Sequence, residues 1–263
     1  MSSGLELYHW EPNTYFLKPL IALAEKGAAF TSHWFDPARL EQFAPGFPRD
    51  TQSELQLERE GPILVHGDTV ISSSFFMLEY IAEALPGVDL TPGDAFAHYR
   101  ARASGQFLVA LGADVSLLGC MKYLAPVLQA QDPQSLNSRL GAIEPQERRN
   151  SWLALLDGTY DEGLLGKTRE RLQFPLRRLE QILGGSKWLA GSDYSIADID
   201  AFALLRSLPT LVPGAVSERE TPRIMEFLAR MNERQAVKQA LGMSRSGKPH
   251  EAFVPGAEPS RWG

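Results

Sequence analysis

Residues 188–202 read Trp188-Leu-Ala-Gly-Ser-Asp-Tyr-Ser-Ile-Ala-Asp198-Ile-Asp-Ala-Phe202, a tight turn followed by an apolar run. Ser195 and Asp198 are three residues apart in this stretch. At a helix start with this spacing, the serine hydroxyl caps an amide of the first turn, and the carboxylate accepts a hydrogen bond from the amide of the serine. The stretch therefore predicts a capped, apolar helix over residues 196–205.

The overall composition is that of a globular protein. The 263 residues are 44% hydrophobic, which is enough to build one large domain or two small ones around a sizeable core. The formal net charge is -6, and Lys and Arg are scattered, so the chain carries no basic footprint for nucleic acid or an anionic membrane. The N-terminus does not read as a signal peptide, and no window approaches the ~20 apolar residues of a membrane span. We expect a cytoplasmic protein with neither nucleic acid nor a membrane as partner.

Cysteine and histidine usage argues against disulfides and metal. The single cysteine, Cys120, excludes an intramolecular disulfide and a Cys-rich zinc site. It lies in the apolar run 115–123, which favours a small buried side chain over a nucleophile. The five histidines show no metal-ligand spacing, so we expect no metal.

Strand and helix signals alternate over residues 1–86, which indicates a small α/β domain. The predicted strands cover 5–10, 30–34, 62–66 and 69–71, and the predicted helices cover 17–26, 38–43 and 75–85. The last two strands flank the turn Gly67-Asp68, so they are predicted to form a hairpin.

Strand signals nearly vanish beyond the Pro- and Gly-rich residues 86–94, and the rest of the chain is predicted to be helical. The predicted helices cover 96–128, 147–165, 172–183, 196–205, 222–231 and 234–241. Pro175 should kink or restart the third of them. We expect an all-α domain over 94–242 and a C-terminal tail over 243–263, which is rich in Gly, Pro and Ser.

The stretch 188–202 resembles the second-domain signature of the glutathione transferase superfamily, and an α/β unit followed by an all-α unit is similar to the architecture of that superfamily. Within it, Asn13 to Leu20 and the hairpin segment 61–74 resemble the bacterial lignin β-aryl etherases. The resemblance implies a thioredoxin-like N-terminal domain with a C-terminal helical bundle. It also implies glutathione as cofactor, an aromatic small molecule as substrate, and a homodimer or a heterodimer with a related transferase.

The resemblance implies a glutathione site along the edge of the first domain. Pro62 matches a cis-proline that leaves Gly61 to pair with the backbone of the tripeptide's cysteine, although it would equally serve only to start a strand. Ser74 matches a serine that holds the γ-glutamyl carboxylate at a helix N-terminus, and it would also serve as an N-cap. Ser73 stands where the relatives have an acidic residue, which removes a charge-assisted hydrogen bond worth about 1.5–3 kcal/mol.

The largest departure from the etherases concerns their catalytic Asn-Ser pair, which falls on Tyr15 and Phe16 when the segments are aligned without gaps. The reaction needs glutathione as thiolate, and a hydroxyl or amide donor beside the sulfur lowers a thiol pKa from about 8.5. Phe16 cannot donate a hydrogen bond. Asn13, Thr14 or the Tyr15 hydroxyl could replace the donor if the loop turned by one residue.

Two further features separate the chain from the etherases. The connection 49–62 is longer and more charged, at the place where the glycine end of glutathione would be held. The first long helix carries small residues where aromatic side chains would stack on an aryl substrate, and close helix packing or a dimer face explains them better. These small residues are Ala110, Gly112, Ala113 and Gly119. We expect Trp10, Tyr15 and Phe16 to form an aromatic wall for a substrate or to pack in a domain interface.

Three functions remain open from the sequence. The chain could be an active etherase, in which glutathione thiolate displaces a phenolate from the carbon alpha to a ketone. It could be a non-catalytic subunit that pairs with a catalytic relative, or a general binder of apolar ligands at the same cleft. The combined loss of the thiolate donor and of the acidic ligand contact favours a subunit whose own site is impaired.

Overall fold

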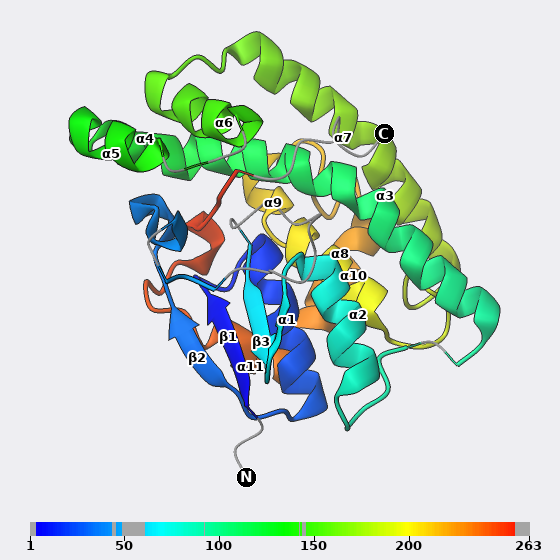
Figure 1. Ribbon diagram of the computed structural model, residues 1–263. Helices are drawn as coiled ribbons and strands as arrows, with labels where there is room; N and C mark the ends of the chain where they lie inside the picture. The colour runs from blue at the N-terminus through cyan, green and yellow to red at the C-terminus, as the bar shows by residue number, and fades with distance from the viewer. Residues whose placement is uncertain are drawn as a thin grey trace.

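The computed structural model describes residues 4–43, 46–48, 61–91, 93–141, 143 and 146–255 (Figure 1). The strands in this part of the chain form one four-stranded mixed sheet in the order β2-β1-β3-β4. They are β1 (Leu5–His9), β2 (Thr31–Trp34), β3 (Ile63–His66) and β4 (Thr69–Ile71). The β1 strand pairs in parallel with β2 and antiparallel with β3, and β3 and β4 form the predicted hairpin.

Two helices accompany the sheet, α1 (Thr14–Lys26) and α2 (Ser74–Ala84), and they pack against each other. The α1 helix begins three residues earlier than predicted. The helix predicted over 38–43 is wrong, because two short 3₁₀ turns, Pro37–Arg39 and Glu41–Phe43, occupy this segment. Leu40 between them has a φ of 57°, which a continuous α-helix does not allow.

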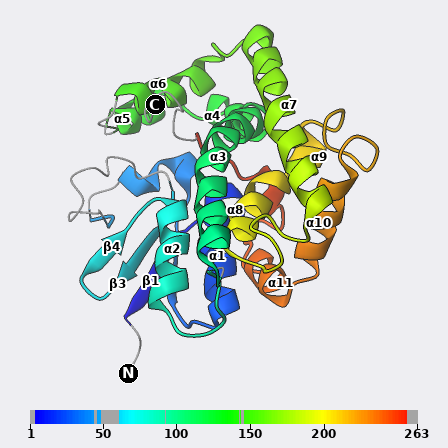
Figure 2. The same ribbon diagram turned by 90° about the vertical axis from the view of Figure 1, so that its right-hand side faces the viewer.

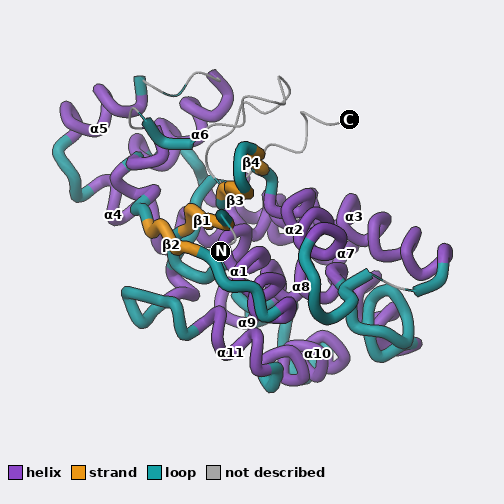
Figure 3. Tube along the Cα trace, turned by 60° about the horizontal axis from the view of Figure 1, so that its bottom comes forward, coloured by secondary structure: helices purple, strands orange, loops and turns teal. Residues whose placement is uncertain are grey.

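The second part of the chain is helical, as predicted, and Figure 2 shows its long helices beside α1 and α2. In Figure 3 the orange strands are confined to one region and purple helices surround them. The helices are α3 (Ala95–Gly119), α4 (Ala125–Gln129), α5 (Pro133–Leu140), α6 (Gln146–Asp157), α7 (Glu162–Gly185), α8 (Ile196–Leu205), α9 (Leu208–Leu211), α10 (Pro222–Asn232) and α11 (Gln235–Leu241). An α/β unit with a small mixed sheet followed by a helical unit confirms the predicted fold class.

The predicted break between the second and third long helices is wrong. The sequence predicts helices over 147–165 and 172–183, whereas α6 ends at Asp157 and α7 runs unbroken to Gly185. Gly158, with a φ of 66°, follows the end of α6, and the Asp161 carboxylate caps α7 by accepting from the Leu164 amide at 2.7 Å. Pro175 lies inside α7 and does not end it, because the leucines on its buried face hold the helix against the core.

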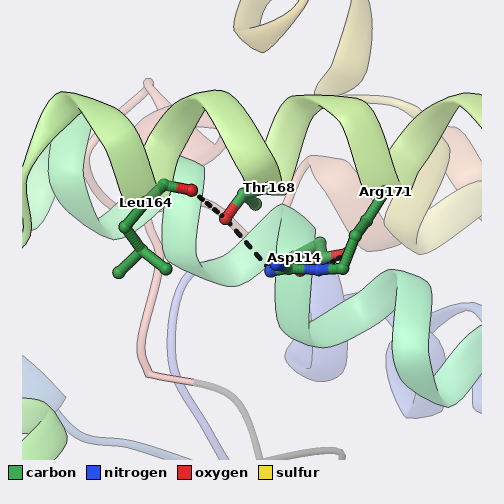
Figure 4. A network of polar contacts seen from close by, with 4 residues as sticks. All are labelled: Asp114, Leu164, Thr168 and Arg171. Carbon is green, nitrogen blue, oxygen red and sulfur yellow. Dashed lines mark hydrogen bonds and ion pairs between the residues drawn. The ribbon is translucent and has the colours of Figure 1, made fainter.

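A polar lock joins α7 to α3 (Figure 4). Arg171 of α7 donates to both carboxylate oxygens of Asp114 on α3, at 2.6 Å from Nη2 and at 3.2 and 3.3 Å from Nε. The same Nη2 reaches the hydroxyl of Thr168, which donates to the carbonyl of Leu164. The lock fixes the rotation of α7 against α3, because a bidentate guanidinium and carboxylate pair has a single good geometry.

The α8 helix is the centre of the interface between the two units, since it packs against both α1 and α3 and all of its residues are buried. The predicted capping box is formed: the Asp198 carboxylate accepts from the Ser195 amide at 2.9 Å. Its second oxygen accepts from the Leu189 amide at 2.9 Å, which ties the preceding turn to the helix. One turn into α8, Asp200 forms a buried ion pair of 2.5 Å with Lys18 of α1.

Glycines of α3 allow close approach by neighbouring aromatic rings. A Cβ atom at Gly105 would lie 2.0 Å from the ring of Phe75 of α2, and one at Gly119 would lie 2.1 Å from the ring of Phe253. These contacts support close helix packing as the reason for the small residues of α3. The predicted helix over 96–128 is confirmed as a continuous helical run, in which a π-helical turn, Cys120–Leu124, joins α3 to α4.

The run from Ala95 to Gln129 is, contrary to expectation, long and apolar enough to cross a membrane, by length and composition alone. Its mean hydropathy reaches 1.5 in an 18-residue window, of which 56% is buried inside this fold. Since α3 packs against α7 and α8, the apolar character of the run is that of a core helix.

The C-terminal residues do not form the expected tail over their described part. Residues 243–255 turn back from α11, and in them Val254 is buried against Phe16 of the first unit and Phe253 against Tyr123 of the helical unit. Residues 256–263 lie outside the described residues.

Candidate functional site

The sheet topology brings the predicted site segments to one edge. Because β1 runs parallel to β2 and antiparallel to β3, β1 and β2 end on the side of the sheet where β3 begins. This row of strand ends, at the top of the sheet in Figure 1, is called the edge below. Helix α1 begins after β1, and α2 begins after β4, so both helix N-termini lie at this edge. The predicted residues of α1, the segment Gly61-Pro62 and the pair Ser73-Ser74 are therefore placed along the same edge.

Strained backbone marks this edge. Three non-glycine residues of the described chain have a positive φ: Thr14 (40°), Leu40 (57°) and Ser73 (66°). Thr14 is the first residue of α1, Leu40 lies in the turns after β2, and Ser73 directly precedes α2. Such conformations cost free energy and gather at active sites and ligand clamps, so their grouping here points to a functional edge.

Asn13 is fully engaged in contacts between the two units. Its Nδ2 donates to the carbonyl of Ala252 at 3.0 Å, and its Oδ1 accepts from Arg206 Nη1 at 3.2 Å and from the Ser207 hydroxyl at 3.1 Å. The side chain is 0% exposed. The predicted thiolate donor is thus a structural amide in this conformation.

Thr14 and Tyr15 differ in what their hydroxyls contact. Thr14 is buried, and within the described part of the chain its hydroxyl makes no hydrogen bond. The Tyr15 hydroxyl points to α3, where it accepts from the hydroxyl of Ser116 at 3.2 Å. Burial raises the pKa of Tyr15 to about 12, so this phenol stays protonated at neutral pH. Of the predicted donors, Thr14 has the only hydroxyl left uncommitted among these described side chains.

Phe16 belongs to an aromatic cluster rather than to an open substrate wall. Its ring meets Trp10 edge to face at 6.2 Å and Phe35 at 5.7 Å, and Val254 completes the cluster. Phe16 is 1% exposed, whereas Trp10 is half-buried. The structure therefore supports core packing for Phe16 and leaves only Trp10 of the pair with a face toward solvent.

The residues expected to hold glutathione occupy both ends of the hairpin. No peptide bond in the described residues is cis, so the cis-proline expected at Pro62 is wrong for this structure. Ser74 is the first residue of α2, and its hydroxyl forms no hydrogen bond within the described chain. Ser73 precedes it at the N-cap and makes no capping bond either. The first amides of α2 thus lack a side-chain cap, and a ligand carboxylate fits them.

Gln42 is a candidate that the sequence did not single out. It lies in the turns after β2, at the same edge of the sheet, and is fully buried. Neither its Oε1 nor its Nε2 has a hydrogen-bond partner in the described structure. Because an unpaired buried amide is costly, Gln42 is suited to a polar ligand group. A glutamine in a weak helical pattern gives no signal of this kind until its burial is known.

A hollow of about 400 Å³ lies elsewhere, at the far end of α1. Its lining includes Leu20, Leu23 and Gly27 of the α1 end and Ala240 of α11. It is separate from the edge that carries Thr14. Within the described ranges, no group of three His, Cys, Asp or Glu side chains is arranged to hold a metal ion.

Glutathione fits this edge in part. The uncapped start of α2 and the unpaired amide of Gln42 offer donors to carboxylate and amide groups. The start of α1, where a thiol would need a donor, is buried beneath other parts of the chain. The connection 49–62 that is expected near the glycine end lies outside the described residues except for Gly61 and Pro62.

Comparison with known proteins identifies the class. Residues 137–235 match the family model described as glutathione S-transferase, C-terminal domain. Together with the four-stranded sheet and the helical unit, this match shows a glutathione transferase C-terminal domain within the fold of glutathione transferases, as the resemblance of the sequence implies.

Within that class the chain is related to LigF from Sphingobium sp. strain SYK-6. The two sequences are 26% identical over 250 residues, which cover 92% of this chain and 94% of LigF. The crystal structure of the β-etherase LigF matches with a TM-score of 0.83 at 25% identity, over 92% of this chain and all of that chain.

Two further relatives show how broadly the likeness extends. Glutathione S-transferase TCHQD from Arabidopsis thaliana is 26% identical over 253 residues, covering 92% of this chain and 91% of that protein. A glutathione transferase family member from Pseudomonas fluorescens, solved with two glutathione molecules bound, has a TM-score of 0.62 at 20% identity, over 92% of this chain and 93% of that chain. The second likeness supports the fold alone.

Proposed function

We propose that the chain binds glutathione at the edge formed by the starts of α1 and α2, and that it acts in glutathione-dependent cleavage of lignin-derived aryl ethers. In this role it is a subunit whose own thiolate site is impaired, and it works in the cytoplasm. The relation to the LigF β-etherase supports the reaction class. The loss of any exposed donor at the start of α1 supports the impairment.

Different residues of the chain would bind different parts of glutathione. Ser74 and the free amides of α2 would hold the γ-glutamyl carboxylate, Gly61 would pair with its backbone, and Ser73 would lie beside its amino group. Glutathione supplies the thiolate that displaces a phenolate in this reaction class. With Asn13 committed to Ala252, Arg206 and Ser207, the described residues at the start of α1 offer no exposed donor that would lower the pKa of that thiol.

The observation that carries this proposal is the contrast between the two helix starts. The α2 start has no side-chain cap and its Ser74 hydroxyl has no partner among the described residues, whereas the α1 start is closed by Asn13 and Phe16. One end of the site is thus prepared for a ligand and the other end is packed. Binding without efficient thiol activation follows from this contrast.

The proposed site is tested by a substitution at Ser73 that should increase the affinity for glutathione. Replacing Ser73 by Glu restores a carboxylate beside the ligand's amino group, and a charge-assisted hydrogen bond of about 1.5–3 kcal/mol corresponds to at least about tenfold tighter glutathione binding in calorimetry. Ser192→Glu, an exposed site in the turn before α8, adds the same charge away from the edge and should leave the affinity unchanged. Equal affinities of the two variants would contradict the proposed site.

Turnover separates the proposal from its alternatives. We expect the purified chain to cleave a model aryl ether poorly alone, and the rate to rise when it is mixed with a catalytic relative. An active enzyme that uses Thr14 would turn over alone and lose that activity in Thr14→Val. A general binder of apolar ligands would bind aromatic compounds without glutathione and show no turnover in either assay.

The proposed dimer would use α2 and the first half of α3, which Figure 2 shows side by side. Phe76 of α2 and Phe96 and Tyr99 of α3 are 58%, 65% and 64% exposed. An ion pair between Glu79 and Arg102 at 2.8 Å joins the two helices. Exposed aromatic groups of this size are typical of interfaces.

Disrupting that surface should change the oligomeric state. We expect Phe96→Glu to convert a dimer into a monomer in sedimentation velocity, because the charge would be buried in the interface. Phe174→Glu on α7 is the matched control, since Phe174 is equally exposed but lies on another helix. A dimer that survives Phe96→Glu would place the interface elsewhere.

A further inference from the structure

The C-terminal strap, defined as residues 243–255, lies across the start of α1. In Figure 1 it is the red segment that passes above the upper ends of β1 and β2 toward the α4 end of the long helix. Apart from a 3₁₀ turn at Pro249–Glu251, the strap has no regular structure. It is therefore held by individual contacts, and two groups of these contacts lie next to the start of α1.

The first contact is a buried carboxylate. Glu11, in the loop between β1 and α1, accepts from the Ser244 hydroxyl at 2.5 Å, from the Arg245 amide at 2.9 Å and from the Ser246 amide at 2.9 Å. The guanidinium of Arg245 also lies over the ring of Trp34, 4.8 Å from its centroid. One side chain thus pins three consecutive residues of the strap next to the start of α1.

The second contact is apolar and covers the helix start itself. The Ala252 carbonyl accepts from Asn13 Nδ2, and Val254 packs in the cluster of Phe16. Between them, the Phe253 ring stacks on Tyr123 with centroids 6.0 Å apart, and it fills the space that Gly119 leaves open. The strap therefore contacts the residues on both sides of Thr14.

This cover contributes to the closure of the start of α1. Asn13, Thr14 and Phe16 are 0%, 1% and 1% exposed, although they lie at the edge where the starts of α1 and α2 are brought together. A thiol can approach the Thr14 hydroxyl only if something above it moves. The strap lacks the helix and strand hydrogen bonds that hold α1 and α8, and segments without such bonds open locally at low cost.

We propose that the strap is an autoinhibitory latch: it competes with the sulfur end of glutathione for the start of α1, and its release opens the site. This inference rests on the proposed glutathione site and adds a mode of regulation to it. In the latch, Glu11 is the pin, because its hydrogen bonds hold the strap in place. Phe253 and Val254 are the plug, because their side chains pack beside the start of α1. The impairment of the thiolate site is then conditional on the position of the strap.

Two point variants weaken the latch without touching the glutathione residues. Glu11→Gln removes the charge from the pin, and Gly119→Ala pushes Phe253 out of its place. Their controls are Glu251→Gln, which alters an exposed strap carboxylate paired with Lys248, and Gly166→Ala on α7, where a Cβ meets nothing within 4 Å. Circular dichroism checks that Glu11→Gln and Gly119→Ala remain folded as full-length chains.

Hydrogen exchange and calorimetry give the readouts. We expect Glu11→Gln to speed amide exchange over 244–255 and 13–17 by about tenfold, the scale of a lost charged hydrogen bond, and to tighten glutathione binding by a similar factor. Gly119→Ala should act in the same direction, and the controls should match the wild type. Glutathione added to the wild-type chain should itself speed exchange in the strap.

Each negative result of these experiments contradicts a stated part of the proposal. If neither variant changes exchange at 13–17, the strap does not cover the start of α1 and the latch is wrong. If exchange rises while glutathione binds all variants equally well, the latch is again wrong, but the proposed binding function stands. If glutathione binds neither the wild type nor the opened variants, the proposed function fails and the inhibitory role of the strap fails with it.

Discussion

Replacing Asp198 with alanine is expected to lower the free energy of unfolding by about 2–6 kcal/mol, since two buried amides lose their acceptor at about 1–3 kcal/mol each. The carboxylate accepts from the Leu189 and Ser195 amides at 2.9 Å and from the Ser195 hydroxyl at 3.4 Å. All three groups are buried at the start of the central α8 helix. A loss of this size is a large fraction of the stability of an ordinary domain.

Denaturant unfolding followed by circular dichroism measures the effect. Asp161→Ala is the matched control, because Asp161 also caps a helix but accepts one amide at an exposed position. Its removal should cost only about 1 kcal/mol, as for an ordinary N-cap. Equal losses in the two variants would show that burial of the Asp198 box adds nothing to its capping role.

The pH dependence of the Asp198 contribution has a definite sign. Burial raises the pKa of Asp198 to about 7, against the opposing effect of hydrogen bonds from the Leu189 and Ser195 amides. A carboxyl whose pKa is higher in the folded state binds more protons when folded, so its contribution to stability falls as the pH rises from about 4 to about 7. The deficit of Asp198→Asn relative to the wild type should therefore be larger at pH 5 than at pH 8.

The capped helix illustrates what a local pattern can predict. The serine and carboxylate spacing, the turn before it and the apolar run after it all lie within fifteen residues, and α8 forms at the predicted residues. The β3–β4 hairpin is similar, because its turn Gly67-Asp68 separates two short apolar strands. In both cases the interactions that decide the structure are close in sequence.

The start of α1 shows why the site itself was harder to predict. The partners of Asn13 are Ala252, Arg206 and Ser207, about two hundred residues away in the chain. No pattern around residue 13 indicates that its amide will be consumed by these groups. The gap-free alignment sets Phe16 against the serine of the etherases, but whether its ring lines a pocket or fills a core depends on Phe35 and Val254.

The predicted C-terminal tail is wrong over residues 243–255 because the composition of this segment and its packing disagree. Gly, Pro and Ser are typical of mobile ends, and they make up nine of the 21 residues of 243–263. Phe253 and Val254 carry the contrary signal, since an adjacent aromatic and aliphatic pair in a polar end is suited to packing against a core. The early end of α6 also had a visible signal, Gly158 followed by Asp161, which is a helix stop followed by a helix start.

The interface between the two units is joined by polar pairs whose partners come from segments far apart in the sequence. Glu25 of α1 pairs with Arg234 before α11 at 2.6 Å, and the Arg234 guanidinium lies 3.5 Å from the centroid of the Tyr194 ring. The deepest of these contacts joins Lys18 of α1 to Asp200 of α8. It connects the helix that begins at the proposed site with the helix that organises the second unit, so its loss should affect both.

Removing Lys18 is the second change with a large expected effect. Its ammonium lies 2.5 Å from the Asp200 carboxylate, and the two side chains are 5% and 2% exposed. Lys18→Met would leave a buried carboxylate without its cation, which costs about 3–5 kcal/mol, whereas replacing both partners by apolar residues is often neutral. Burial already raises the pKa of Asp200 and Lys18 opposes that rise, so the Lys18→Met deficit should shrink at acidic pH, where Asp200 takes up a proton.

A double-mutant cycle in denaturant separates the pair from its surroundings. We expect Lys18→Met with Asp200→Leu to be more stable than Lys18→Met alone, because the second change removes the uncompensated charge. Lys238→Met, which breaks an exposed pair with Glu233, is the control and should cost at most about 1 kcal/mol. If the two changes at the buried pair instead add their costs, the charges are not coupled, and the interface between α1 and α8 is held by apolar packing alone.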